Sequence, residues 1–438
     1  MKILFISLGC DKNLSDSEEM LGLLTANGHE IVDSEEEADA IVINTCCFIH
    51  DAKEESVNTI LEMAEYKKSG TCKALIVTGC MAQRYKEEIT QEIPEVDAVL
   101  GTTSYGDIVK ALNEVQAGNV FQEFRDINEL PEDCGRRVIT TGGHFGYLKI
   151  AEGCDKHCTY CIIPFARGRV RSRKIEEVLS EVETLAAKGY KEVVLTGIHL
   201  SSYGVDFPKE ERESLLSLIQ AVSRVEGISR IRLGSLEPRI ITEEFLEGIV
   251  KTGKVCPHFH LSLQSGCNKT LKNMNRRYSA QEYAEKCELI RKFYPAPALT
   301  TDVIVGFPQE TEEDFEESYE FVKKIHFYET HIFKYSRRHG TKAAAMDGQL
   351  TEAVKAQRSE KLLELHDIRA KEYEEAMIGK TIELLLEEEI EEDGKMWYVG
   401  HSREYVRAVI EKTEAHQVND LVEAKVTGFV TDHLLRAE

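Results

Sequence analysis

The 438-residue sequence lacks several features that would place it in an easily recognised class. No apolar run reaches the roughly 20 residues that a membrane-spanning helix needs. The N-terminal segment MKILFISLGC is followed by the polar DKN, without the apolar core and small-residue cleavage site of a signal peptide. We therefore expect a cytoplasmic protein with no membrane partner.

Positive residues are outnumbered by negative ones. The chain has 54 Lys and Arg against 77 Asp and Glu, a net charge of −23. Broad nucleic-acid binding needs a positive surface that displaces counterions, so this balance argues against it but leaves room for a local basic patch. Internal repeats and low-complexity tracts are absent as well. The length and a hydrophobic content of 42% indicate a globular protein of two or three domains.

What the sequence does contain is an α/β pattern. In residues 1–115, the short β-branched runs KILFISLG, DAIVINT and KALIVTG alternate with helical patterns, which predicts a Rossmann-like domain with a parallel sheet. In residues 140–370, six strand candidates separated by helices predict a partial TIM-type (βα)6 barrel. In residues 371–438, short strands with turn signals predict a small β-barrel of the oligonucleotide-binding kind.

Three cysteines directly follow the first barrel strand, in EGCDKHCTYCIIP. Cys154, Cys158 and Cys161 form a CxxxCxxC motif, and three thiolates on one loop suit an iron–sulfur cluster. A zinc knuckle is the alternative, but tetrahedral zinc takes four ligands and only His157 is nearby. Three ligands for four irons would leave one iron open to a chelating substrate.

Three more cysteines each end a predicted strand, in ILFISLGC, AIVINTC and ALIVTGC. Cys10, Cys46 and Cys80 are separated by 36 and 34 residues, one strand–helix unit each. Because the carboxyl ends of adjacent parallel strands converge, we expect these thiols to meet. Buried cysteines can also be small packing residues, but that does not explain why three strands end alike. Cys47 is an alternative ligand to Cys46, which the NTC pattern favours.

The remaining cysteines have no partner spacing and are interpreted as structural or incidental: Cys72, Cys134, Cys256, Cys267 and Cys287.

The CxxxCxxC spacing resembles the signature of the radical S-adenosylmethionine (radical SAM) superfamily. The resemblance implies a reduced cluster that cleaves S-adenosylmethionine to methionine and a deoxyadenosyl radical. Tyr160 matches the aromatic position that lies against the adenine in that superfamily, although a packing role is equally compatible with the sequence.

Together, the N-terminal cysteines, the CxxxCxxC barrel and the C-terminal barrel resemble the methylthiotransferases, whose last domain is called TRAM. This resemblance covers essentially the whole chain. It implies two [4Fe-4S] clusters, the second on Cys10, Cys46 and Cys80, and an electron donor such as flavodoxin or ferredoxin. One S-adenosylmethionine would methylate a sulfur, and a second would yield the radical that removes hydrogen from the target carbon.

Two branches of that family are recognisable in the chain. SLGCDKNLSDSEEML and NTCCFIHDAKEES look like the enzyme that modifies an aspartate of a small-subunit ribosomal protein. From YCIIPFARGRVRSRK onward, LTGIHLSSYG, LGSLEP and HFHLSLQSGCNKTLKNMNRRY are similar to the enzyme acting on threonylcarbamoyladenosine in tRNA. The switch suggests a chimera. Because the reacting barrel and the last domain resemble the tRNA branch, tRNA is the expected substrate, with the ribosomal protein as the alternative.

An alternating run of basic residues follows the cluster motif. Arg167, Arg169, Arg171 and Arg173, followed by Lys174, could track RNA phosphates or instead form a solvated face with ion pairs. Possible extensions of this patch are Arg276, Arg277, Arg337 and Arg338. Residues 376–438 contain only seven Lys and Arg against fourteen Asp and Glu, which disfavours an RNA-binding surface there.

Polar residues at barrel strand ends are the remaining candidates. The predicted contacts to the cofactor or reacting centre are Ser262, Gln264, Thr301, Asp302 and Glu237, with hydrogen bonding inside the barrel as the alternative for each. Strand alternation would place Ser262 and Gln264 on one face. The family's usual GFPGET appears as GFPQET, so Gln309 replaces a glycine.

Two other functions stay open on sequence alone. One is a non-catalytic iron–sulfur scaffold or electron carrier, which would normally supply four cysteines to its cluster. The other is a radical enzyme with a single cluster and inert N-terminal cysteines.

Overall fold

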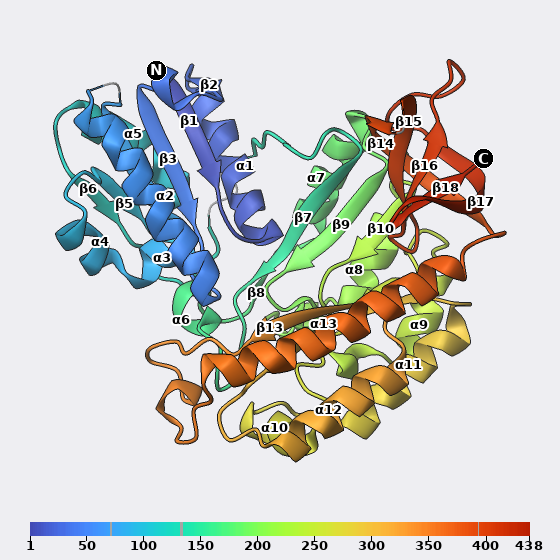
Figure 1. The fold of residues 1–438 in the computed structure, drawn as a ribbon. Coiled ribbons are helices and arrows are strands. Elements are labelled where there is room, and N and C mark those ends of the chain that lie inside the picture. Colours follow the sequence, from blue (N-terminus) through green and yellow to red (C-terminus); the bar gives the residue numbers. More distant parts are fainter. Residues whose placement is uncertain (71, 132–134, 393) are drawn as a thin grey trace. The chain divides into compact units, whose positions relative to one another are not determined.

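The computed structural model describes residues 1–70, 72–131, 135–392 and 394–438 (Figure 1). The chain forms two compact units. The N-terminal unit consists of Met1–Thr140, Ala151–Ser172 and Ser336–Thr341. The barrel unit consists of Thr141–Ile150, Arg173–Tyr335 and Lys342–Glu438. None of the helices in the described residues combines the length and apolar character that a membrane span requires.

The N-terminal unit is built on a parallel sheet with the strand order β2-β1-β3-β4-β5-β6. Its strands are β1 Lys2–Ser7, β2 Glu30–Val32, β3 Ala40–Thr45, β4 Ala74–Thr78, β5 Ala98–Leu100 and β6 Phe121–Glu123. Its helices are α1 Asp11–Ala26, α2 His50–Lys68, α3 Gly79–Arg84, α4 Lys86–Glu92, α5 Ile108–Gln116 and α6 Ile163–Arg167.

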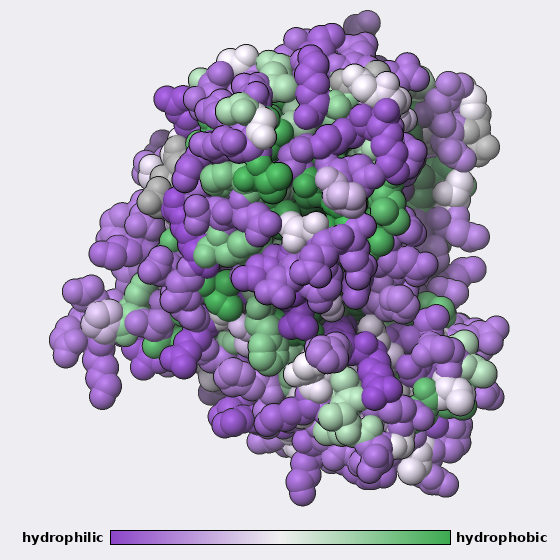
Figure 2. All heavy atoms as spheres, turned by 90° about the vertical axis from the view of Figure 1, so that its left-hand side faces the viewer, coloured by the Kyte–Doolittle hydropathy of each residue, from purple (hydrophilic) through white to green (hydrophobic). Residues whose placement is uncertain are grey.

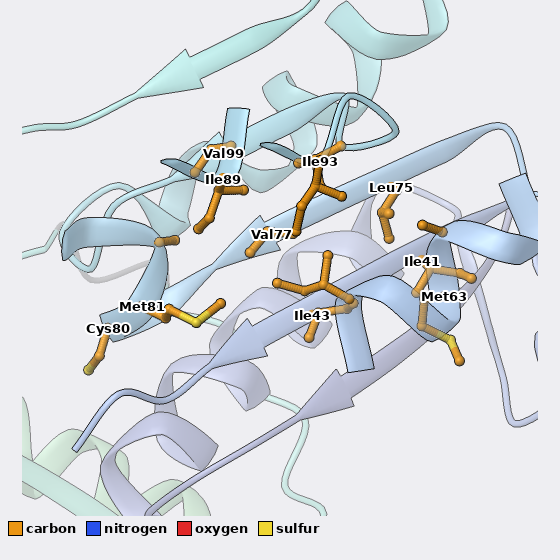
Figure 3. Close-up of a cluster of buried hydrophobic side chains, with 14 of the residues drawn as sticks. Ile41, Ile43, Met63, Leu75, Val77, Cys80, Met81, Ile89, Ile93 and Val99 are labelled. Carbon is orange, nitrogen blue, oxygen red and sulfur yellow. The ribbon is translucent and has the colours of Figure 1, made fainter. Parts of the chain in front are cut away.

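Both faces of this sheet are covered, which is why its central strands β3 and β4 are buried along their whole length and mostly apolar. Every residue of β3 is buried. Ile41 and Ile43 point to one apolar cluster, and Ala40 and Val42 belong to another on the opposite face. Figure 3 shows the first cluster, which reaches Cys80 and Met81 at the start of α3.

The sheet continues further along the chain than expected. The first domain was expected to end at residue 115, but β5 pairs with β6, whose Phe121 lies opposite Ala98. The segment Ala151–Ser172, assigned from sequence to the barrel domain, packs within the N-terminal unit. The strands β5 and β6 have three residues each, too few to show a period in the sequence.

Each of the six strands predicted between residues 145 and 336 is present. Together with β8, a two-residue strand of the N-terminal unit, they form two sheets with the orders β10-β9-β7-β8 and β11-β12-β13. Their bounds are β7 Phe145–Glu152, β8 Arg171–Ser172, β9 Glu192–Gly197, β10 Arg230–Leu233, β11 His258–His260, β12 Ala298–Val305 and β13 Glu329–Lys334. Parallel bridges from Ile231 to Val255 and from Leu236 to Leu261 connect the two sheets, as in a partial barrel.

The barrel strands alternate with helices that bury one apolar side. Those helices are α7 Ile175–Ala187, α8 Leu215–Val222, α9 Glu243–Val250, α10 Asn268–Asn273, α11 Ala280–Phe293, α12 Glu312–Ile325 and α13 Glu352–Glu375. Capping boxes begin several of them; Ser279 and Glu282 form the one at α11. The short 3₁₀ helices of the chain are Glu35–Glu37, Tyr105–Asp107, Leu200–Ser202, Lys209–Glu211, Pro238–Ile240 and Ala343–Ala345.

The last strands close a small barrel in the order β14-β15-β16-β18-β17, as the sequence predicts for a TRAM-like domain. They are β14 Thr381–Glu392, β15 Lys395–Ser402, β16 Arg407–Glu411, β17 Leu421–Thr431 and β18 Leu434–Ala437. The barrel has an apolar core of its own, which includes Leu384, Tyr398 and Leu435. Hydrophilic side chains dominate the molecular face shown in Figure 2, with apolar groups exposed in smaller areas.

Candidate functional site

The N-terminal unit brings Cys10, Cys46 and Cys80 to one edge of its sheet. The strands that precede them, β1, β3 and β4, are direct neighbours in the sheet and run parallel. Cys10 caps the N-terminus of α1, and Cys80 lies in the first turn of α3. The convergence expected from the sequence is therefore what the topology produces.

Charge on each of these thiols affects the pKa of its neighbours. Burial, with smaller contributions from Cys80 and Cys10, raises the pKa of the Cys46 thiol to about 11. Burial also raises the pKa of the Cys80 thiol, the Arg167 guanidinium opposes this, and Cys10 adds to it. A buried thiol with a raised pKa keeps its proton. It becomes a ligand only when it loses that proton and a bound cation compensates for the buried negative charge.

Two glycines permit this close packing. Gly9 has a φ of +94°, and a Cβ there would lie 2.7 Å from the Cβ of Cys46. Gly79 also has a φ of +94°, and its Cβ would lie 2.5 Å from the carbonyl oxygen of Thr45. The glycine before Cys10 and the glycine before Cys80 are thus both required by the backbone.

Cys46 and Cys47 occupy different surroundings. The Ser56 hydroxyl accepts a hydrogen bond from the backbone N–H of Cys46 at 3.0 Å and donates one to its carbonyl at 2.9 Å. Cys47 packs in the apolar cluster of the sheet face, where burial strongly raises its thiol pKa. Cys10 contributes to the electrostatics of Cys46, whereas the main influences on Cys47 besides burial are Cys80, Cys46 and two arginines.

The CxxxCxxC loop forms a second group of thiols in the same unit. Burial raises the pKa of Cys154 to about 11, with a contribution from Cys158. It raises the pKa of Cys161 to about 12, with contributions from Cys158 and Cys154. The loop is tightly turned, because the backbone N–H of Cys161 donates to the carbonyl of Cys158 at 3.1 Å. The N–H of Ile163 donates to the Cys161 sulfur at 3.4 Å.

Each cysteine group offers three thiols, the donor type that holds iron–sulfur clusters. Backbone N–H groups that point at cysteine sulfur, as at Cys161, are also a feature that suits such clusters. The two donor sets therefore fit the cofactor type that the sequence implies.

The predicted RNA-binding arginines do not form an exposed stripe, and this expectation is wrong. Arg167 is 1% exposed. Arg171 is buried and donates to the carbonyls of Arg167 and Arg169 at 2.7 and 2.8 Å. Arg173 forms an ion pair with Glu181 at 2.7 Å. Arg169 is left as the exposed member of the run. An alternating pattern looks the same in sequence whether its charges face water or buried carboxylates.

Two of the proposed extensions of the basic patch bind protein carbonyls. Arg276 donates to the carbonyl of Ser262 at 3.1 Å. Arg338 donates to the carbonyl of Tyr160 at 2.8 Å, and Tyr160 itself is 6% exposed. These arginines therefore shape the backbone at candidate site residues.

The prediction for Thr301 and the pairing of Gln264 with Ser262 need correction. Thr301 is fully buried, and its hydroxyl bonds to Leu261 O at 2.5 Å and Leu263 N at 3.1 Å, so it joins neighbouring strands and is closed to a cofactor. Gln264 has a φ of +71° and lies beyond the end of β11. The alternation argument that paired it with Ser262 therefore fails, because it assumed a continuous strand.

Asp302 lies in a polar cluster that was not predicted from the sequence. Its carboxylate is 3.2 Å from Nε2 of His260, whose Nδ1 is 3.0 Å from the hydroxyl of Thr300. The ring of His331 lies 5.5 Å from that of His260. Burial lowers the pKa of His331, as does charge on His260. The signal was present in HFHLS, where His258, His260 and Ser262 alternate with apolar residues.

A second missed contact involves Glu237. Nε2 of His199 is 3.5 Å from the Glu237 carboxylate, and both follow barrel strands, β9 and β10. Gln309, which replaces a glycine of the family pattern, has a φ of +67°, so a glycine-type backbone is kept by a residue with a side chain.

The burial of the other described cysteines is consistent with a structural role. Cys72, Cys256, Cys267 and Cys287 are all buried. Cys134 lies outside the described residues.

Family models match both parts of the chain. Residues 2–101 match the uncharacterised protein family UPF0004, and residues 148–322 match the radical SAM superfamily. Among solved structures, the radical S-adenosylmethionine methyltransferase TsrM from Kitasatospora setae has a TM-score of 0.54 at 13% identity, covering 77% of this chain and 72% of TsrM. This likeness concerns the fold.

Three relatives of similar length share the same name. The ribosomal protein uS12 methylthiotransferase RimO of Lachnoclostridium phytofermentans is 48% identical, covering 90% of this chain and 89% of its own. The RimO of Clostridioides difficile is 40% identical, covering 98% and 99%. That of Acetivibrio thermocellus is 42% identical, covering 91% and 88%.

These matches overturn the expected tRNA substrate and tRNA partner. The relatives are named for action on a ribosomal protein, and they extend over the N-terminal part and the barrel alike. The suggested division of the chain between two branches receives no support from them. The chain belongs to the radical S-adenosylmethionine methylthiotransferases, transferases that use a [4Fe-4S] cluster and S-adenosylmethionine.

Proposed function

We propose that this protein attaches a methylthio group to an aspartate of ribosomal protein uS12. The observation that carries the proposal is 48% identity to a uS12 methylthiotransferase over 90% of the chain. The burial of Arg167 and Arg171 supports it, because it removes the basic run that had favoured RNA.

The charge of the protein supports a protein substrate as well. The chain has a net charge of −23, and residues 376–438 share this acidic excess. Proteins that bind RNA neutralise phosphates with Lys and Arg, so a ribosomal protein is expected to be cationic. An acidic enzyme attracts such a substrate and repels free tRNA.

We assign Cys154, Cys158 and Cys161 as ligands of the radical SAM cluster. Cys10, Cys46 and Cys80 are the ligands of a second [4Fe-4S] cluster in this proposal. When bound, the radical SAM cluster would supply the electron that cleaves S-adenosylmethionine, whose deoxyadenosyl radical removes hydrogen from an unactivated carbon. A carbon-bound hydrogen of this kind is not acidic, so a general base alone cannot remove it.

The surrounding residues have supporting roles in this assignment. Tyr160 is held in place through its carbonyl by Arg338 and would lie against the adenine of S-adenosylmethionine. Asp302 and Ser262 remain candidates for contact with the cofactor at the barrel strands. A reduced flavodoxin or ferredoxin would supply electrons.

The substrate is tested with reconstituted anaerobic protein, S-adenosylmethionine and reductant. Purified uS12 and bulk tRNA are offered together, and both are analysed by mass spectrometry. We expect one methylthio group on an aspartate of uS12 and none on tRNA nucleosides. Modified tRNA with unmodified uS12 would refute the proposal. The Cys158→Ala variant controls for chemistry that does not depend on the radical cluster.

The second cluster is tested by iron content and electron paramagnetic resonance (EPR). We expect Cys46→Ala to lose the iron of the N-terminal site and Cys47→Ala, its matched neighbour, to keep it. Loss in Cys47→Ala alone would reverse the assignment of the ligand. Full iron in both variants, and also in Cys10→Ala and Cys80→Ala, would leave a single-cluster enzyme.

A further inference from the structure

The most heavily bonded buried charge near the N-terminal thiols is Arg167. Its guanidinium is 1% exposed and forms ion pairs with Asp16 at 2.7 Å and Glu152 at 3.2 Å. Its Nε donates to the sulfur of Cys80 at 3.3 Å, and its Nη2 donates to Oδ1 of Asn13 at 2.5 Å. All four partners belong to the N-terminal unit.

Asn13 extends this network to the other strand ends. Its Nδ2 donates to the carbonyl of Leu8, two residues before Cys10, and to that of Thr45, directly before Cys46; both distances are 2.9 Å. The Cys80 sulfur is 3.8 Å from Oδ1 of the same side chain. The Arg167 guanidinium thus bonds to the side chain of Cys80, and the Asn13 amide bonds to the backbone just before Cys10 and Cys46.

Arg167 is also the last residue of α6, which follows the CxxxCxxC loop. The backbone N–H of Cys154 donates to the carbonyl of Gly168 at 3.0 Å. The hydroxyl of Thr102 donates to the carbonyl of Ala166 at 2.7 Å. The loop that carries one set of thiols thus delivers the arginine that contacts the other set.

We propose that Arg167 is a positioning residue that holds the Cys80 sulfur by an N–H···S hydrogen bond and so raises the reduction potential of the cluster on Cys10, Cys46 and Cys80, an inference that rests on the proposed second cluster. A donor to a cluster thiolate stabilises the more negative, reduced state. The effect is large in a dry site, where charges are weakly screened. Asp16 at Nη2 and Glu152 at Nη1 hold the guanidinium in place and leave its Nε–H for the sulfur.

Two substitutions separate the hydrogen bond from charge. Arg167→Lys keeps a positive charge opposite Asp16 and Glu152 but removes the Nε–H that reaches sulfur, so it should lower the reduction potential of the cluster. Asp16→Asn keeps the arginine and its Nε–H but removes one negative charge, so its shift measures the effect of charge alone and should be an increase.

The measurement is a redox titration followed by EPR in the full-length chain. The background is Cys154→Ala, Cys158→Ala and Cys161→Ala, in which only the N-terminal site can hold a cluster. We expect about a tenfold change in the ratio of reduced to oxidised cluster at a fixed potential, equivalent to about 59 mV for one electron. Arg358→Lys is the matched control, because Arg358 is also buried and pairs with Glu310 at 2.6 Å.

The outcomes separate the two proposals. A background protein without iron would overturn the second cluster itself. A loaded cluster whose potential is the same in Arg167→Lys as in the background would overturn the role of Arg167 alone. An equal shift in Arg358→Lys would also overturn it, by showing a general effect of buried arginines. If Arg167→Lys fails to fold, Arg167→Gln, which also lacks the Nε–H, is measured instead, and a potential that is not lowered overturns the role.

Discussion

At the scale of single residues, the candidate site depends on what the backbone permits beside each cysteine. Gly9 and Gly28 have similar left-handed conformations, with φ of +94° and +81°. A Cβ at Gly9 would collide with Cys46, whereas one at Gly28 meets nothing within 4 Å. Alanine at either position strains the backbone, but only alanine at Gly9 would also displace the Cys46 side chain.

We expect Gly9→Ala to lose most of the iron bound by the N-terminal thiols. Gly28→Ala should keep that iron, although the left-handed backbone costs each variant about 1–2 kcal/mol of stability. Iron content per chain and the EPR signal of the reduced protein provide the measurement. Equal iron in the two variants would show that Cys46 is not a ligand or that its position is unimportant.

At the scale of elements, buried ion pairs connect a barrel strand to the C-terminal barrel. Arg232 of β10 donates to Glu192 of β9 at 2.6 Å and to the carbonyl of Ser402 at 3.2 Å. Arg230 pairs with Glu383 of β14 at 2.8 Å. Burial alone would raise the pKa of Glu192, but Arg232 and Arg230 outweigh it and lower the pKa.

Glu192→Gln should destabilise the barrel unit by about 3–5 kcal/mol, because it leaves buried arginines without their shared carboxylate. Glu383→Gln, at a position that is one-third exposed, should cost no more than about 1 kcal/mol. Urea unfolding followed by the fluorescence of Trp397, the single tryptophan, measures both. Since the pKa of Glu192 is lowered, its contribution is present above its ordinary pKa of 4.5 and is lost as the pH falls below that value. Similar midpoints for the two variants would contradict this account.

At the scale of the whole molecule, the net charge of −23 should govern the encounter with a cationic ribosomal protein. Added salt shortens the reach of this attraction, to about 10 Å at 0.1 M. We expect the KM for uS12 to rise several-fold between low and physiological ionic strength, while kcat at saturation changes little. Initial rates at several salt concentrations test this. Salts with different anions at the same ionic strength are the control. A KM that does not depend on salt, or inhibition by tRNA at low salt, would contradict the proposal that charge attracts uS12 to the enzyme.

Much of the fold was predictable because it depends on local patterns. The strands ending in Cys10, Cys46 and Cys80 and the barrel strands were recognisable as apolar runs at regular spacing. The short β5 and β6 were not, because three residues carry no period. The pairing of Gln264 with Ser262 failed because strand alternation says nothing about where a strand ends. The burial of Thr301 was not predictable because its partners Leu261 and Leu263 come from a distant stretch of the chain.

The sequence by itself determined which thiols occur together, since the CxxxCxxC spacing is covalent and parallel strands must end on one edge. Only the tertiary structure decided the role of the arginine run. Arg167 faces Asn13, Asp16, Cys80 and Glu152, which come from four distant stretches of the chain. Whether a charged side chain is solvated or buried depends on what packs over it, and that is a property of the folded chain as a whole.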